Sequence, residues 1–149
     1  MRGKRFWLDF DAGVLATIVM SIVMVVATVT GISPMPKPIP MAIVARILGG
    51  GLPKPVLIAL GATAHLGYGG TFGGALAVAT PRVTVRKGLL LGAMLWVVMQ
   101  VLWLPFLGWG MFGSAVTPKI AGATLVLHLI YGGTVGWVTR PPEVQTLRA

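Results

Sequence analysis

The chain has 149 residues, of which 56% are hydrophobic and 10% are charged, and its formal net charge is +9. Soluble globular domains average about 45–50% apolar and about 25% charged residues, so this composition excludes a water-soluble enzyme. It also excludes a disordered chain, which needs low hydrophobicity. The absence of cysteine excludes disulfides, thiolate catalysis and iron–sulfur clusters. The composition therefore predicts a small integral membrane protein, with residues 1–149 forming a single membrane domain.

Four apolar stretches without Asp, Glu, Lys or Arg are long enough to cross a bilayer as helices, which takes about 20 residues. They cover about residues 12–30, 56–79, 88–107 and 120–138. None of them alternates with a period of two, so helices are predicted rather than a barrel. The predicted fold class is therefore all-α integral membrane, with four transmembrane helices.

The N-terminal segment is predicted to be a retained first span. The apolar run after its basic residues is too long for the core of a signal peptide, and no cleavage site follows it. Asp9 and Asp11 stand where the first span is expected to begin, and carboxylates there cap free N–H groups and favour the helix dipole.

The basic residues flank the predicted spans, and their distribution predicts the topology. The side that holds both termini carries the larger group: Arg2, Lys4, Arg5, Arg82, Arg86, Lys87, Arg140 and Arg148. The other side carries Lys37, Arg46, Lys54 and Lys119. The positive-inside rule then predicts a multi-pass protein of the cell (plasma) membrane with cytoplasmic N- and C-termini. The excess of basic residues indicates contact with anionic membrane lipids rather than with nucleic acid.

The first connection, residues 31–54, is the longest. Residues 33–40 are rich in proline and are expected to be extended, because proline fixes φ and lacks an N–H donor. Residues 41–48 are apolar except for Arg46, which predicts a short helix at the outer interface with Arg46 reaching the headgroups. The alternative is that this segment forms a lid over the bundle or a docking surface for another subunit.

An internal repeat is the most informative feature of the sequence. Residues 65–73 (HLGYGGTFG) recur as residues 128–136 (HLIYGGTVG), and the first and third predicted spans match more weakly, with Gly13 and Met24 aligned to Gly88 and Met99. The predicted repeat units are about 12–80 and 88–140, each a helical hairpin. Two spans per unit give both units the same orientation, related by a two-fold axis along the membrane normal. The second and fourth spans should then be parallel, with their two histidines at the same depth.

Each of these two spans carries a histidine, a tyrosine and two glycines on one face, because residues three and four apart are neighbours on a helix. The first interpretation is packing, in which G-x-x-x-G grooves let helices approach closely and each histidine bonds to a neighbouring helix, for example to Gln100, Thr17 or Ser21. The residues concerned are His65, Tyr68, Gly69 and Gly73 in the second span, and His128, Tyr131, Gly132 and Gly136 in the fourth.

The alternative interpretation is a b-type haem with His65 and His128 as axial ligands and the glycines making room for the macrocycle. Helices that touch through their glycines leave no such room, so no cofactor is the first expectation. Copper at Met20, Met24, Met94 and Met99 is weaker, since methionine stripes are more often core or lipid-facing, and no metal site is predicted. A small transporter, which would have to form a homo-oligomer, is the second alternative. Pro105 is expected to bend or end the third span.

Several features together resemble a family of small four-span membrane proteins of archaea and bacteria that carries a domain of unknown function. They are the first span from Gly13 to Met24, the proline-rich connection, the W-x-x-M-x(5)-P pattern and the H-x-x-Y-G motif. The last two comprise Trp96, Met99, Pro105, His128, Tyr131 and Gly132. The resemblance implies proteins that accompany respiratory oxidases. The expected function is therefore that of a non-catalytic accessory subunit, which packs through glycine-rich helices against other integral membrane subunits of a respiratory complex.

Overall fold

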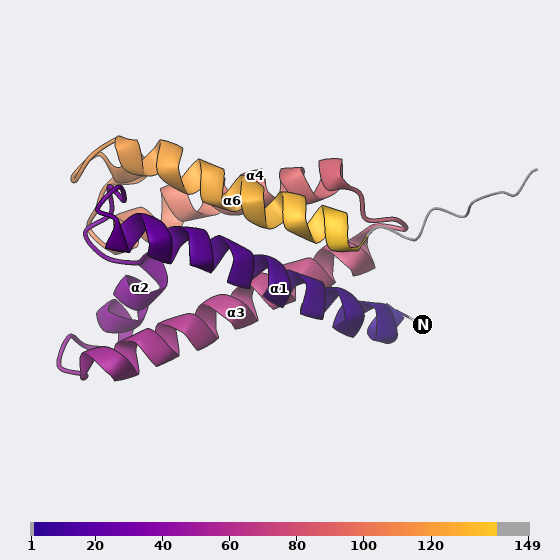
Figure 1. Cartoon of the computed structure of the whole chain (residues 1–149), viewed down its shortest axis with the longest axis horizontal. Coiled ribbons are helices and arrows are strands. Elements are labelled where there is room, and N and C mark those ends of the chain that lie inside the picture. Colours follow the sequence, from indigo (N-terminus) through magenta and orange to yellow (C-terminus); the bar gives the residue numbers. More distant parts are fainter. Residues whose placement is uncertain (1, 140–149) are drawn as a thin grey trace, which may run out of the picture.

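A computed structural model describes residues 2–139, and all the regular elements in this part of the chain are helices (Figure 1). The predicted all-α class is therefore confirmed. In chain order the elements are α1 (Arg2–Val29), α2 (Ile39–Leu48), α3 (Lys54–Ala79), α4 (Val85–Val98), the π-helix η1 (Met99–Trp103), α5 (Leu104–Phe106), the 3-10 helix η2 (Met111–Gly113) and α6 (Lys119–Val138). Since α4, η1 and α5 follow one another without a break, they form one long helix over residues 85–106.

Three helical segments are long and apolar enough to cross a membrane: Arg5–Val29, Val85–Phe106 and Lys119–Val138. They correspond to the first, third and fourth predicted spans. Helix α3 covers the second predicted span and is 26 residues long, but it is not among these three. Its glycines and His65 dilute the apolar residues along its length, so its hydropathy is lower than that of the other long helices.

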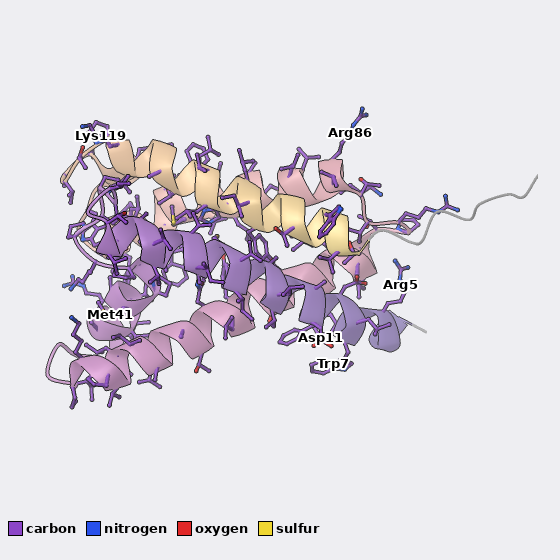
Figure 2. All side chains as sticks on the ribbon, in the orientation of Figure 1. Arg5, Trp7, Asp11, Met41, Arg86 and Lys119 are labelled. Carbon is purple, nitrogen blue, oxygen red and sulfur yellow. The ribbon has the colours of Figure 1, made fainter. Side chains whose placement is uncertain are left out.

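The long helices form two antiparallel pairs. Helix α1 packs chiefly against α3, and α4 packs chiefly against α6, while a further contact between α1 and α6 joins the pairs. Figure 1 shows that α3 and α6 run in the same direction, away from the end of the bundle where α2 lies. Arg5 and Arg86 lie at one end of the bundle and Lys119 lies at the other (Figure 2), which is the segregation that the sequence predicted for them. Arg140 and Arg148, assigned to the first group, lie outside the described residues.

The first helix begins earlier than predicted. It starts at Arg2, so Asp9 and Asp11 lie within the helix and do not cap its N-terminus. The extension has a packing reason, because the ring of Phe10 lies against Gly70 of α3 and the ring of Phe6 lies against Gly74. The first helix thus extends past the N-terminal limit of its apolar run because these two aromatic rings pack on the glycine surface of α3.

The predicted helix in the first connection is present, but it begins at Ile39 and includes Pro40. Pro40 was expected in an extended segment. Proline is tolerated there because the first N–H groups of a helix have no partner within the helix. Helix α2 packs against α3, where a Cβ atom on Gly61 would lie 3.0 Å from the Cα of Met41. Helix α2 thus packs on the bundle at α3, a contact that both the interfacial-helix prediction and the lid alternative allow.

Pro105 does not end the third long helix, which continues to Phe106. The five residues of η1 just before it form a π-helix, a wider turn that accommodates the missing N–H donor and the bulk of the proline ring. The chain then reverses direction through residues 107–118. The prediction of a bend at Pro105 thus corresponds to a widened turn that precedes the proline.

Candidate functional site: a cavity between the helix pairs

The glycines of the second helix pair bring two backbones into direct contact. A Cβ atom on Gly88 of α4 would meet the carbonyl oxygen of Gly132 of α6, and a Cβ atom on Gly92 would meet that of His128. One on Gly136 would lie 2.7 Å from the carbonyl oxygen of Thr84. No side chain larger than hydrogen fits at these positions unless the helices move apart.

The first helix pair makes contacts of the same form. A Cβ atom on Gly13 of α1 would meet the carbonyl oxygen of Gly69 of α3, and one on Gly73 would lie 2.7 Å from the carbonyl oxygen of Asp9. The neighbouring helix therefore occupies the grooves that were predicted at four glycines: Gly69, Gly73, Gly132 and Gly136. Their open faces are occupied by α1 and α4.

The two histidines are partly buried and have different hydrogen-bond partners. His65 Nδ1 lies 3.2 Å from Ser21 Oγ of α1, which is a contact proposed from the sequence. His128 Nδ1 lies 2.8 Å from the carbonyl oxygen of Thr124 in its own helix, so the expected bond to a neighbouring helix is not formed by this residue. Because a carbonyl only accepts, Nδ1 of His128 carries the proton and Nε2 presents a lone pair.

Thr124 and Gln100 hold the region around His128 in place. Gln100 Nε2 donates to Thr124 Oγ1 at 2.9 Å, and Thr124 Oγ1 in turn donates to the carbonyl oxygen of Ile120 at 2.6 Å. Gln100 and Thr124 are both buried. Gln100 lies in η1, so the widened turn places its amide against α6. Gln100 was expected to contact a histidine directly, and it instead reaches the helical turn that holds His128.

Two tyrosines were singled out in the sequence, Tyr68 of α3 and Tyr131 of α6, and they make different contacts. The hydroxyl of Tyr131, which is 2% exposed, donates to the carbonyl oxygen of Gly69 at 2.6 Å and so links α6 to α3. Tyr68 packs its ring against Phe72, with ring centroids 4.6 Å apart. Tyr131 thus joins the two helix pairs, whereas Tyr68 packs on its own helix and on the core between the pairs.

A cavity of about 310 Å³ lies between the two pairs and is covered by α2. Ligand pockets typically enclose about 300–1,000 Å³ and are mostly apolar with a few polar groups, and this cavity fits that description. His65 and His128 both line it, together with Tyr68 and Tyr131. The other lining residues used below are Thr17, Met20, Met24, Met35, Ile47, Ala64, Met99, Trp103, Thr124 and Leu127.

The methionines that the sequence singled out do not share one environment. Met20, Met24 and Met99 are buried and line the cavity, whereas Met94 is 66% exposed and points away from it. In residues 2–139, no group of three or more His, Cys, Asp or Glu side chains is arranged to hold a metal ion.

Sequence reasoning found the histidines and tyrosines but missed most of the cavity wall. Met35 and the side chains of α2 carried no motif, and their part in the cavity depends on how α2 folds back between α1 and α3 at the end where these two helices lie apart. Trp103 and Leu127 lie in continuous apolar stretches, where the sequence does not distinguish the residues that face a cavity from those that face lipid or the core. The signals that the sequence did carry were the histidines of the repeat and the methionines Met20, Met24 and Met99.

Three apolar helices long enough to cross a bilayer, with a cavity at the centre of the bundle, are consistent with a small helical membrane protein. The chain belongs to a family of unknown function, DUF6789, whose model matches residues 6–145. No curated protein and no solved structure matches the chain. The expected resemblance to a family that carries a domain of unknown function is thus confirmed.

Proposed function

We propose that the protein is a non-catalytic accessory subunit of a larger membrane complex, with four transmembrane helices arranged as two parallel hairpin repeats. The observation that carries the proposal is the outward face of α3. A stripe of small residues runs along this face, and the large apolar side chains that α3 exposes lie toward its two ends, at Val56, Ile58, Leu60 and Val78.

The fourth span in this proposal is α3. It packs along α1, which is long and apolar enough to cross a membrane, and it runs parallel to α6. The contact with α1 lies on the C-terminal half of α3, at Gly69, Gly70, Gly73 and Gly74, and a helix of 26 residues is long enough to cross a bilayer. The matching glycine contacts of the two pairs support the repeat, and the basic residues at the end that holds Arg5 and Arg86 support cytoplasmic termini. A reporter fused to the N-terminus should be active in the cytoplasm, and a periplasmic N-terminus would refute this orientation.

Small residues recur at every fourth position along the outward face of α3: Ala59, Thr63, Gly67, Thr71 and Ala75. A Cβ atom on Gly67 would meet nothing within 4 Å. The hydroxyls of Thr63 and Thr71 donate to carbonyl oxygens of their own helix at 3.0 and 2.7 Å. The face is therefore smooth, and these hydroxyl donors already have partners. Small residues at this spacing let another helix approach closely, which is how helices associate in lipid.

The outward faces of the other long helices carry large apolar side chains instead. On α1 they include Leu15, Ile18 and Ile22, and on the third long helix they include Leu90 and Val101. Such side chains suit contact with lipid tails. The contrast indicates that α3 faces a transmembrane helix of another integral membrane protein while α1 and α4 face membrane lipids.

The proposal is tested by purifying the tagged protein from its native membrane in a mild detergent and separating the extract by native electrophoresis. We expect the wild type to migrate with larger partners. Respiratory complexes are the first to test, because the resemblance described above points to them. A bulky substitution on the α3 face, Gly67→Phe, should release the protein from its partners, whereas Leu90→Phe on the lipid-facing side of α4 should not. Migration of the wild type as a small monomer, or as a homo-oligomer alone, would contradict the proposal.

A bis-histidine haem b carrier is the second candidate, favoured by the position of both imidazoles on one cavity. The surrounding residues do not fit a porphyrin, however. Tyr131 crosses from α6 to α3 one turn from His128, and the glycine faces are filled by α1 and α4. We therefore expect no Soret band from the purified protein, oxidised or dithionite-reduced. A Soret band that disappears in both His65→Ala and His128→Ala would establish the haem carrier instead.

A further inference from the structure

We propose that the cavity binds the ring of a membrane-dissolved quinol, with its two hydroxyl groups donating hydrogen bonds to Nε2 of His65 and Nε2 of His128. This inference goes beyond the accessory role and does not rest on it. It follows from which polar atoms around the cavity are already paired and which are not.

Most polar groups on the cavity wall are paired within the protein. The hydroxyl of Tyr131 donates to Gly69, that of Thr17 donates to the carbonyl oxygen of Gly13 at 2.8 Å, and that of Thr124 donates to Ile120. The Nδ1 atoms of both histidines are paired as well. The hydroxyl of Tyr68 and the indole of Trp103, which also line the cavity, are partners of each other. The Nε2 atoms of His65 and His128 have no hydrogen-bond partner within the described part of the chain.

Nε2 of His128 requires a ligand that donates a hydrogen bond, and Nε2 of His65 requires one as well in the tautomer that carries its proton on Nδ1. The proton on Nδ1 of His128 leaves Nε2 as an acceptor, and the same state of His65 results when its Nδ1 donates to Ser21. The acceptors come from α3 and α6, on two sides of one cavity. A single ring that carries two hydroxyl groups supplies a donor for each of these acceptors. The reduced, quinol form has two donors, whereas the oxidised quinone has only acceptors.

The remainder of the wall suits a flat apolar ring and a hydrocarbon tail. Met20, Met24 and Met99 contribute polarizable thioethers, and Trp103 contributes an aromatic surface. The volume of about 310 Å³ holds one substituted ring rather than a large fused-ring lipid. The cavity reaches the surface beside the end of α2, because Ile47, which lines it, is 62% exposed. A hydrocarbon tail leaves through this mouth, where Ala64 of α3 is also exposed.

The experiment measures equilibrium binding of three probes of the same shape to the full chain in lipid nanodiscs, by titration calorimetry without oxygen. The probes are a decyl-substituted benzoquinol, the corresponding quinone, and the dimethyl ether of the quinol. We expect the quinol to bind about tenfold more tightly than the other two, since two neutral hydrogen bonds of modest net strength are lost with them. Comparing the probes requires no substitution in the protein.

Substitutions in the protein test two points: that the probes bind in this cavity, and that a donor on the ligand bonds to His128. Ala64→Trp should block the mouth and abolish binding of all three probes, whereas Ala62→Trp, on the same helix but outside the cavity wall, should leave binding unchanged. His128→Phe removes one of the two acceptors, so it should reduce the affinity for the quinol about threefold and leave that for the quinone unchanged. Equal affinities for the three probes, no binding at all, or quinol binding that survives Ala64→Trp would overturn the inference. Binding of a Cu(I) ion that His128→Phe abolishes, in a protein that does not bind the quinol, would assign the cavity to a metal instead.

Discussion

The two helix pairs use the same backbone contact but differ at one position beside it. In both pairs a glycine of the first helix lies against a glycine carbonyl of the second, at Gly13 and Gly69 in one pair and at Gly88 and Gly132 in the other. One turn further along, α4 has Gly92, which lies against the backbone of α6. At the matching place α1 has Thr17, whose side chain fills the space in front of Gly69.

Because of this difference, the glycine of α6 packs against backbone atoms, whereas the equivalent glycine of α3 packs against side chains. The contacts of Gly132 are with the backbone of Gly88 and Gly92, which cannot yield unless the helices separate. The contacts of Gly69 are with the side chains of Thr17 and Tyr131, and a side chain can rotate. Two glycines that are equivalent in the sequence repeat should therefore differ in how strictly they exclude a methyl group.

The largest effect is expected from Gly132→Leu. A leucine would force α4 and α6 apart, because its side chain meets backbone atoms of α4 that have no room to move, and its cost should lie at or above the upper end of the usual range for overpacking, about 3 kcal/mol. The protein should fail to accumulate as a monodisperse species in size-exclusion chromatography. The matched control is Gly122→Leu in the same helix, where a Cβ atom meets nothing within 4 Å. If both variants behave alike, the close contact of α4 with α6 is wrong.

A sharper comparison uses alanine at the two equivalent glycines. Gly132→Ala should lower the free energy of unfolding by about 1–3 kcal/mol, because the new methyl group meets backbone. Gly69→Ala should cost about 1 kcal/mol, since Thr17 can rotate at the expense of its hydrogen bond to Gly13. Denaturation in mixed SDS micelles, followed by circular dichroism, measures both.

The control for this comparison is the double variant Thr17→Ala with Gly69→Ala. Removing the threonine hydroxyl makes room for the new methyl group, so the double variant should be more stable than the sum of the two single changes predicts. Additive effects would mean that Thr17 does not fill the space in front of Gly69. Costs of equal size for Gly132→Ala and Gly69→Ala would remove the distinction between the pairs.

A smaller effect is expected from Tyr131→Phe, which tests the link between the pairs. The change removes the hydroxyl that donates to Gly69 and leaves a buried carbonyl oxygen with one partner fewer. A buried polar contact of this kind contributes about 1 kcal/mol. The thermal midpoint in detergent should fall while the helical content stays unchanged. An unchanged midpoint would show that the pairs are held together without this bond.

The helices could be predicted from the sequence because each is an apolar run with clear limits. The histidines could be found because a repeat singles them out, and His65 even has the partner, Ser21, that helix pairing suggested. Some of the predictions that failed concern helix ends. The start of α1 depends on Phe6 and Phe10 packing on glycines of another helix, which no local rule contains. The turn at Pro105 depends on a π-helix that the apolar sequence of η1 does not mark.

The cavity could not be predicted, for a related reason. Its walls come from all the long helices and from α2, so it exists only where their crossing leaves space. His128 was expected to reach a neighbouring helix, as His65 does. It instead bonds to Thr124 in its own helix, because the position on α4 that matches Ser21 of α1 holds Trp96. The indole of Trp96 donates to the carbonyl oxygen of Ala121 at 3.0 Å and offers the imidazole no hydroxyl.

The smallest effect is expected from Arg5→Gln, which concerns the end of the first pair. The guanidinium of Arg5 donates to the carbonyl oxygens of Thr80 and Pro81 at 3.3 and 3.1 Å, just past the C-terminus of α3. A cation there complements the negative end of the helix dipole and contributes about 0.3–0.5 kcal/mol at an exposed site. The thermal midpoint of Arg5→Gln should fall slightly at low ionic strength, and the difference should shrink as salt screens the charge. A difference that stays constant with salt would mean that Arg5 stabilises this end by packing its alkyl stem rather than by its charge.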